Sequence, residues 1–112
     1  MMTISGIHLT RIGKGNFLLE PLRSMNIADQ GRLMQEIVTQ VRQGQGVRLY
    51  YDLNGLPVID PVYYGWLSNL ARTCRIVNIE MICINMEPTA AFTLSSFVSG
   101  KPEFATALAV PD

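Results

Sequence analysis

The sequence contains little of the chemistry on which most enzymes depend. Its 112 residues include one histidine, His8, and two cysteines, Cys74 and Cys83. His8 has no serine, cysteine or carboxylate at a suggestive spacing, and the cysteines form no CxxC pattern. We therefore predict no catalytic residue, no metal site and no cofactor, and we expect the protein not to be an enzyme. The two cysteines are expected to be buried thiols.

Charge of one sign and long apolar runs are also missing. Nine Lys and Arg residues balance nine Asp and Glu residues, and no stretch concentrates one sign. This argues against nucleic acid or an anionic membrane as a partner. The apolar runs, such as Met81 to Ile84, are far shorter than the roughly 18–20 residues of a membrane span. The N-terminus lacks a basic stretch followed by an apolar one, so a cytoplasmic location is expected. Zero net charge favours self-association, and we expect a homo-oligomer.

What the sequence does have is a regular succession of strand and helix patterns, in a length that suits a single domain over residues 1–112. Residues 7–12 alternate apolar and polar side chains, and a Gly-Lys-Gly turn at 13–15 separates them from the apolar residues 17–19, which predicts an N-terminal hairpin. Apolar residues three and four positions apart then predict two helices. Their stripes are Leu33, Met34, Ile37, Val38 and Val41, and Val62, Tyr63, Trp66, Leu67, Leu70, Ala71 and Cys74.

Further strands are predicted on either side of the second helix. Residues 47–51 are rich in β-branched and aromatic side chains, and residues 79–84 form a nearly continuous apolar run of strand length, which is typical of a strand covered on both faces. A third helix is expected from Glu87 to near Gly100, and a weak last strand over 104–108. This order predicts an α/β fold with right-handed, parallel crossovers.

The start of the second helix has two features of interest. Asp60 is a preferred capping residue, and Pro61 suits the first helical position. Tyr63, Tyr64 and Trp66 follow, and three aromatic residues in four positions cannot all face inward. At least one should reach solvent, and Tyr64 is the candidate for an exposed anchor in a protein contact. The alternative is that Tyr64 is an ordinary surface residue.

Two segments carry a resemblance to a known family. Residues 51–60 read Tyr-Asp-Leu-Asn-Gly-Leu-Pro-Val-Ile-Asp, and residues 88–94 read Pro-Thr-Ala-Ala-Phe-Thr-Leu after a buried strand. With the helix between them, they resemble a STAS domain, the family of sulfate transporters and anti-sigma factor antagonists. The resemblance covers nearly the whole chain and is greatest to the stand-alone scaffold proteins of the bacterial stressosome.

The resemblance implies a STAS fold, with a four- to five-stranded mixed sheet and helices packed against it. It also implies a non-catalytic protein-binding module in a partner-switching pathway of stress signalling. The expected partner is a switch-type serine/threonine kinase or anti-sigma factor, and other STAS proteins are further candidates. The residues expected to bind the partner are Asn54, Gly55, Asp60, Pro61, Tyr63 and Tyr64.

The chain departs from the family at the position that regulates binding. Capture of the partner is normally cancelled by phosphorylation of a Ser or Thr directly after the aspartate at the start of the second helix. Here that position is Pro61, which has no hydroxyl, and no Ser or Thr lies between Asn54 and Leu67. We therefore expect a phosphorylation-insensitive antagonist or a scaffold subunit.

A second reading within the same family is a small STAS subunit of an ABC-type lipid transport complex. Such subunits usually keep a hydroxyl residue after the aspartate, so Pro61 does not favour this alternative.

Overall fold

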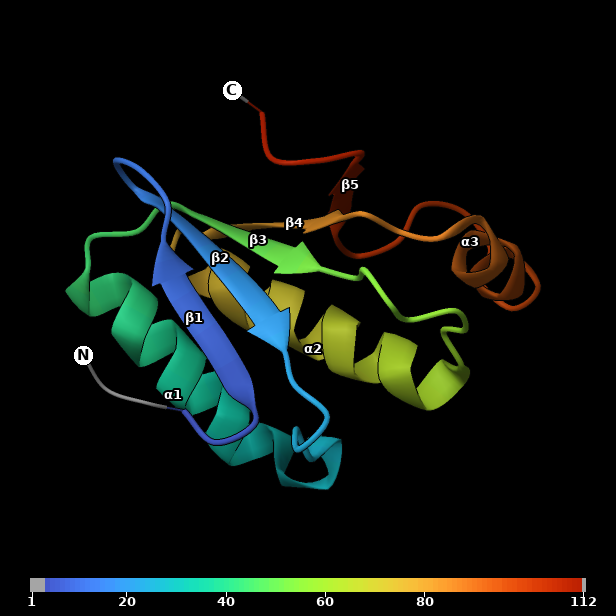
Figure 1. Ribbon diagram of the computed structural model, residues 1–112, viewed down its shortest axis with the longest axis horizontal. Coiled ribbons are helices and arrows are strands. Elements are labelled where there is room, and N and C mark those ends of the chain that lie inside the picture. The colour runs from blue at the N-terminus through green and yellow to red at the C-terminus, as the bar shows by residue number, and fades with distance from the viewer. Residues whose placement is uncertain (1–3, 112) are drawn as a thin grey trace.

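The computed structural model describes residues 4–111, which contain one five-stranded mixed sheet. Strands β1 (Ile7–Arg11) and β2 (Asn16–Pro21) form the predicted antiparallel hairpin. Strands β3 (Arg48–Asp52), β4 (Glu80–Ile84) and β5 (Ala105–Ala107) add to it in parallel, in the order β1-β2-β3-β4-β5 (Figure 1). The predicted α/β class, the hairpin and the parallel crossovers are confirmed.

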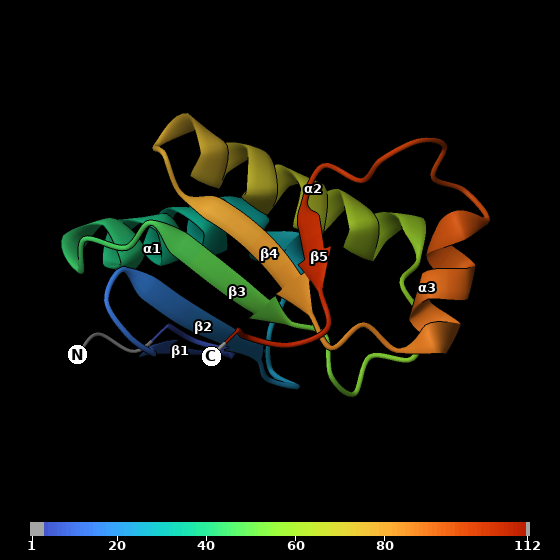
Figure 2. The same cartoon turned by 90° about the horizontal axis from the view of Figure 1, so that it is seen from above.

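The helices lie on one side and at one end of this sheet. A 3-10 helix (Ile27–Asp29) leads into α1 (Gln30–Gln43), and α1 and α2 (Pro61–Ile76) pack over the same face of the sheet (Figure 2). The third helix, α3 (Pro88–Ser95), lies beyond the carboxyl ends of the strands, close to the start of α2. This arrangement brings the loops after β3 and β4 together at one end of the molecule.

The core fills the space between the sheet and helices α1 and α2. Alternate residues of each strand face the helices, as a period of two requires, and the helical stripes meet them. The fully buried side chains include Leu19, Leu49, Tyr51, Leu33, Ile37, Val41, Trp66, Leu67, Leu70 and Cys74. The two predicted stripes are therefore confirmed as core except for Met34 and Tyr63, which are partly buried, and Val62, which is exposed.

Among the residues that the structure describes, no helix lies on the opposite face of the sheet (Figure 2). The prediction that β4 is covered on both faces is therefore wrong in part. Met81 and Cys83 are buried toward the helices, whereas Ile82 on the other face is only half-buried. The apolar run does not distinguish a strand covered on both faces from one covered on a single face. Neighbouring strands alone bury part of a central strand, and this already favours apolar residues.

The C-terminal elements are shorter than predicted. Helix α3 ends at Ser95 rather than near Gly100, and β5 keeps only three residues, all exposed. The hydroxyls of Ser95 and Ser96 donate to the carbonyls of Phe92 and Thr93, at 2.8 and 2.6 Å, and so compete with the regular helical bonds. Local side-chain bonds of this kind end helices.

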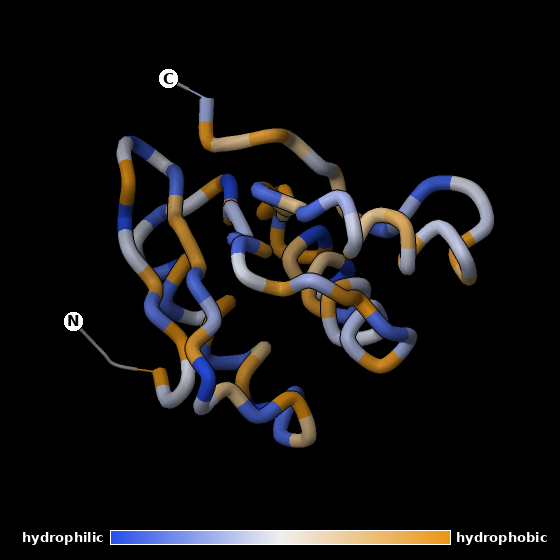
Figure 3. Tube along the Cα trace, turned by 45° about the vertical axis from the view of Figure 1, so that its right-hand side comes forward, coloured by the Kyte–Doolittle hydropathy of each residue, from blue (hydrophilic) through white to orange (hydrophobic). Residues whose placement is uncertain are grey.

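Hydrophobic and hydrophilic residues are interspersed along the chain rather than gathered in one segment (Figure 3). Within residues 4–111, no helix is both long enough and apolar enough to cross a membrane.

Candidate protein-binding site

The loop between β3 and α2, residues 53–60, is held rigidly in place. Leu53 and Ile59 are completely buried and fix its two ends. Between them, the Leu56 N–H donates to the Leu53 carbonyl at 3.1 Å, which closes a four-residue turn. Gly55 is the third residue of this turn and has φ +84°, a value that glycine adopts without strain. Asn54 and Gly55 are the two central residues of this turn.

Two hydrogen bonds fasten this loop to α3. The Gly55 N–H donates to a Glu87 carboxylate oxygen at 2.8 Å, and the Ile59 N–H donates to the Thr93 hydroxyl at 3.2 Å. Asp52 adds a third tie, because its Oδ1 accepts from the Asn54 N–H at 2.8 Å and from the Asn85 side chain at 3.0 Å. The loop is therefore bonded to residues far away in sequence, and its exposed atoms are preorganised.

Helix α2 begins as the sequence predicts. The Asp60 carboxylate accepts a hydrogen bond from the Tyr63 N–H at 2.8 Å, and Pro61 takes the first helical position. Both side chains are exposed. In the described part of the chain, no basic side chain pairs with Asp60. Its negative charge is therefore available to a partner.

Of the three aromatic residues at the start of α2, Trp66 is in the core as predicted, and the two tyrosines are partly buried. Trp66 is completely buried, and its Nε1 donates to the Tyr51 hydroxyl at 2.9 Å. The Tyr51 hydroxyl is also 2.6 Å from that of Tyr63. Burial raises the pKa of Tyr51 well above its ordinary value, and burial also raises the pKa of Tyr63. Both hydroxyls therefore keep their protons and form a neutral relay.

Tyr64 is half-buried and is not the exposed anchor that was predicted. Its ring packs edge-on against Phe97, with the centroids 5.7 Å apart, and tilted against Phe104 at 5.9 Å. Both contacts come from the segment after α3, which the helical spacing of α2 alone could not place.

Exposed apolar side chains occur at the start of α2 where the prediction put none. Val62 was assigned to the buried stripe but is 67% exposed, because the first turn of α2 extends past the ends of the strands (Figure 2). Val58 is 51% and Phe92 76% exposed. We call Val58, Asp60, Pro61, Val62 and Phe92 the α2-start surface.

Sequence reasoning thus found the polar part of this surface and missed its apolar part. The sequence did not indicate that Val62 and Phe92 are exposed, since each falls at a spacing compatible with a buried stripe. The one available signal was position, because side chains in the first turn of a helix after a long loop often project beyond the core.

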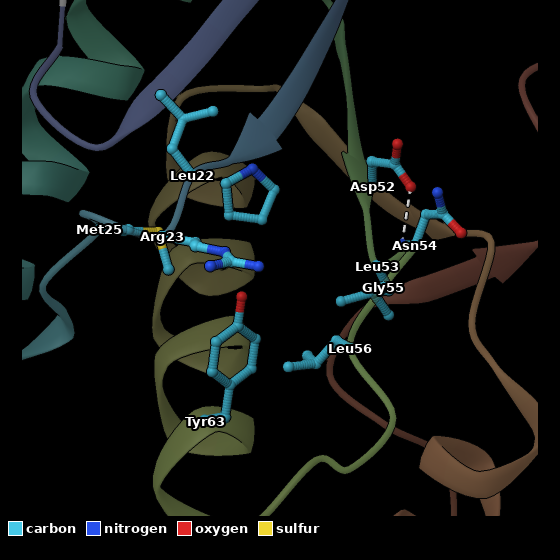
Figure 4. A pocket seen from close by; sticks show the side chains of 10 residues that line it. Leu22, Arg23, Met25, Asp52, Leu53, Asn54, Gly55, Leu56 and Tyr63 are labelled. Atoms are coloured by element: carbon cyan, nitrogen blue, oxygen red, sulfur yellow. Dashed lines mark hydrogen bonds between the residues drawn. The ribbon is translucent and has the colours of Figure 1, made fainter.

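A pocket of about 260 Å³ opens between the end of β2 and the loop after β3. Of the predicted residues, Asn54, Gly55 and Tyr63 line it, whereas Asp60, Pro61 and Tyr64 do not. The residues that sequence reasoning missed here are Pro21, Leu22, Arg23, Met25, Asp52, Leu53 and Leu56. Figure 4 shows Leu22, Arg23 and Met25 from the segment after β2, Leu56 from the loop after β3 and Tyr63 from α2 around one space.

The two cysteines and the histidine are the remaining residues that the sequence analysis considered for reactivity or metal binding. Cys74 and Cys83 are free and buried, as predicted. Burial raises the pKa of the Cys74 thiol to about 12 and raises that of Cys83 further. His8 lies exposed on β1, 3.2 Å from the Glu20 carboxylate. Among residues 4–111, no cluster of His, Cys, Asp and Glu side chains could hold a metal ion.

No protein-family model matches the sequence, and no curated protein is similar to it in sequence. Solved structures, in contrast, match the fold over nearly its full extent. A serine-to-glutamate variant of RsbS from Moorella thermoacetica is 17% identical, with a TM-score of 0.73 over 95% of this chain and 89% of that one. The chain has the STAS fold.

Two further structures with the STAS fold show the same similarity. A chain from the molecular architecture of the stressosome, described as a signal integration and transduction hub, is 17% identical, with a TM-score of 0.72 over 90% of this chain and 87% of that one. The unphosphorylated anti-sigma factor antagonist SpoIIAA is 16% identical, with a TM-score of 0.59 over 93% and 89%. At these identities the similarity concerns the fold, which confirms the fold expected from residues 51–60 and 88–94.

Proposed function

We propose that the protein is a non-catalytic, cytoplasmic protein-binding module that acts as an anti-sigma factor antagonist or stressosome scaffold. The observation that carries this proposal is the α2-start surface, which is exposed and apolar on a rigid part of the STAS fold. Of the eight large hydrophobic side chains that are exposed in residues 4–111, three belong to this surface. Val58 lies on the tethered loop, Val62 at the start of α2 and Phe92 on α3. Exposed apolar side chains of this kind are typical of protein interaction sites.

The chemistry of this surface indicates the kind of partner. Val58, Val62 and Phe92 offer apolar contacts, and Asp60 adds one unpaired negative charge. We infer that the partner is a switch-type kinase or anti-sigma factor with an apolar patch and a basic side chain opposite Asp60. Such complementarity sets the orientation of a partner as well as its affinity. The lipid transport subunit gains no support from the similar structures.

Affinity capture tests this function directly. The tagged protein is used to recover partners from its native cells, which are identified by mass spectrometry. Recovery of a switch kinase, an anti-sigma factor or other STAS proteins is the expected result. Recovery of an ABC-type ATPase, or of no specific protein, would overturn the proposal.

The second part of the proposal is that binding is insensitive to phosphorylation at the start of α2. Pro61 is exposed at the first helical position and has no hydroxyl. Ser68, on the same helix, is 4% exposed and out of reach of a kinase. We expect no stoichiometric phosphate on the wild-type protein after incubation with the recovered kinase, whereas Pro61→Ser should acquire phosphate on the new serine. Mass spectrometry checks both, and stoichiometric phosphate on Ser95 or another residue of the wild type would contradict insensitivity.

Asp60 is expected to contribute to partner binding beyond its role as a cap. Asp60→Ala removes the cap and should lower the free energy of unfolding by about 0.5–2 kcal/mol. Asp60→Asn keeps a capping oxygen and removes only the charge, so stability should be nearly unchanged. Both variants should bind the recovered partner several-fold more weakly, as measured by calorimetry beside urea unfolding. If Asp60→Asn binds as tightly as the wild type, Asp60 is only a cap.

A further inference from the structure

The pocket beside the α2-start surface combines an apolar wall with two hydrogen-bond donors. Leu22, Met25 and Leu56 supply apolar surface, and the Arg23 guanidinium and the Tyr63 hydroxyl supply polar atoms. In Figure 4 the Tyr63 ring points its hydroxyl toward the space beside the Arg23 guanidinium, with Leu22, Met25 and Leu56 around them. An apolar pocket with a few convergent polar groups is the usual form of a small-molecule site.

The tyrosine relay allows the Tyr63 proton to point into the pocket. The Trp66 indole can only donate, so the Tyr51 oxygen accepts from it. The Tyr51 proton has two acceptors within reach, the Met25 sulfur at 3.9 Å and the Tyr63 oxygen at 2.6 Å, and either tyrosine can donate across the latter contact. When an acceptor in the pocket takes the Tyr63 proton, Tyr51 can donate to the Tyr63 oxygen in its place.

Arg23 adds a positive charge to the same space. Its side chain forms no ion pair or hydrogen bond with any residue between 4 and 111. The acidic residue of the pocket, Asp52, lies on the opposite side, where it is bonded to Asn54 (Figure 4) and to Asn85. Among the described residues that line the pocket, Arg23 is therefore the one cation, Tyr63 offers a neutral hydroxyl, and the one carboxylate, that of Asp52, is bonded elsewhere.

We propose that this pocket binds a small monocarboxylate with an apolar body. One carboxylate oxygen accepts from Tyr63 and the other pairs with Arg23, while the body packs against Leu22, Met25 and Leu56. Charge-assisted bonds from a guanidinium to a carboxylate are stronger than bonds between neutral groups. The volume of about 260 Å³ accommodates a body such as a single ring or a short branched chain. This site does not depend on the proposed partner.

Titration followed by backbone amide NMR tests the proposal with defined probes. Benzoate, phenylacetate and isovalerate are compared with benzamide and phenylacetamide, which have similar shapes without the charge. At least one carboxylate should give saturable shifts at Arg23, Gly55 and Tyr63, with a Kd on the order of 0.1–1 mM. The matching amide should bind at least about tenfold more weakly. Absence of saturable shifts with every carboxylate up to about 20 mM, or equal binding of amide and carboxylate, would overturn the proposal.

Three variants identify the groups responsible. Arg23→Gln should weaken carboxylate binding by about tenfold or more, and Tyr63→Phe should weaken it by about threefold to tenfold. Arg42→Gln removes another exposed arginine, on α1 and outside the pocket, and should leave binding unchanged. Each variant is first shown to keep the wild-type amide spectrum away from its own site. Equal binding by Arg23→Gln and the wild type would contradict the site, as would equal losses in Arg23→Gln and Arg42→Gln.

Discussion

Trp66→Ala is expected to lower the free energy of unfolding by about 3–5 kcal/mol, the range for truncating a large buried aromatic side chain. Trp66 is completely buried at the centre of α2 and is the largest of the fully buried side chains. Its removal leaves a cavity beneath the sheet. It also leaves the Tyr51 hydroxyl without the donor that is now 2.9 Å away. A loss of this size is a large part of the stability of a small domain.

The measurement is urea unfolding followed by circular dichroism, because Trp66 is the only tryptophan and its fluorescence disappears with it. Val62→Ala is the matched control on the same helix. Since Val62 is 67% exposed, its truncation should change the free energy of unfolding by less than about 0.5 kcal/mol. A loss below about 1 kcal/mol for Trp66→Ala would show that α2 does not enclose this side chain in the way described.

Replacing Val62 and Phe92 together by glutamine should abolish most of the binding of the recovered partner. A buried apolar anchor at the centre of an interface costs about 2–4 kcal/mol when it is removed, so the loss should be at least about thirtyfold even if only one of the two side chains is such an anchor. Both side chains are exposed in the free protein, at 67% and 76%, so stability should change little. This separates loss of binding from loss of folding.

Ile76→Gln is the control for this double substitution. Ile76 is 81% exposed at the opposite end of α2, away from the α2-start surface. Binding is measured by calorimetry or surface plasmon resonance with the partner obtained by affinity capture. If Ile76→Gln weakens binding as much as the double variant, or if the double variant binds like the wild type, the interface lies elsewhere on the molecule.

Features that depend on neighbours in sequence were predictable. The hairpin at residues 7–21 follows from a period of two and a glycine turn, and the start of α2 follows from Asp60 and Pro61. The stripe that ends at Cys74 follows from a period of 3.6. These are local properties, because a side chain repeats its direction at intervals set by the backbone alone. The short motifs at 51–60 and 88–94 were sufficient to indicate the STAS fold.

Only the tertiary structure decided which side chains stay exposed and which residues far apart in sequence come into contact. Val62 has the spacing of a core residue, yet the first turn of α2 lies beyond the sheet and nothing covers it. Tyr64 has the spacing of a surface residue, yet Phe97 and Phe104 enclose it. Periodicity gives the direction of a side chain but not whether another element reaches it, because that depends on where the chain returns tens of residues later.

The candidate site likewise combines features that the sequence predicts with features that only the tertiary structure shows. Residues 51–64 alone indicated a loop followed by the Asp60 cap, since these features depend on residues only a few positions apart. The bonds from the loop to Glu87 and Thr93 span 32 and 34 residues. The pocket likewise brings together Arg23, which follows β2, and Tyr63, which lies on α2. The sequence by itself therefore determined the elements and the chemistry of the loop, whereas the tertiary structure decided the shape of the surface, because shape arises from contacts between distant segments.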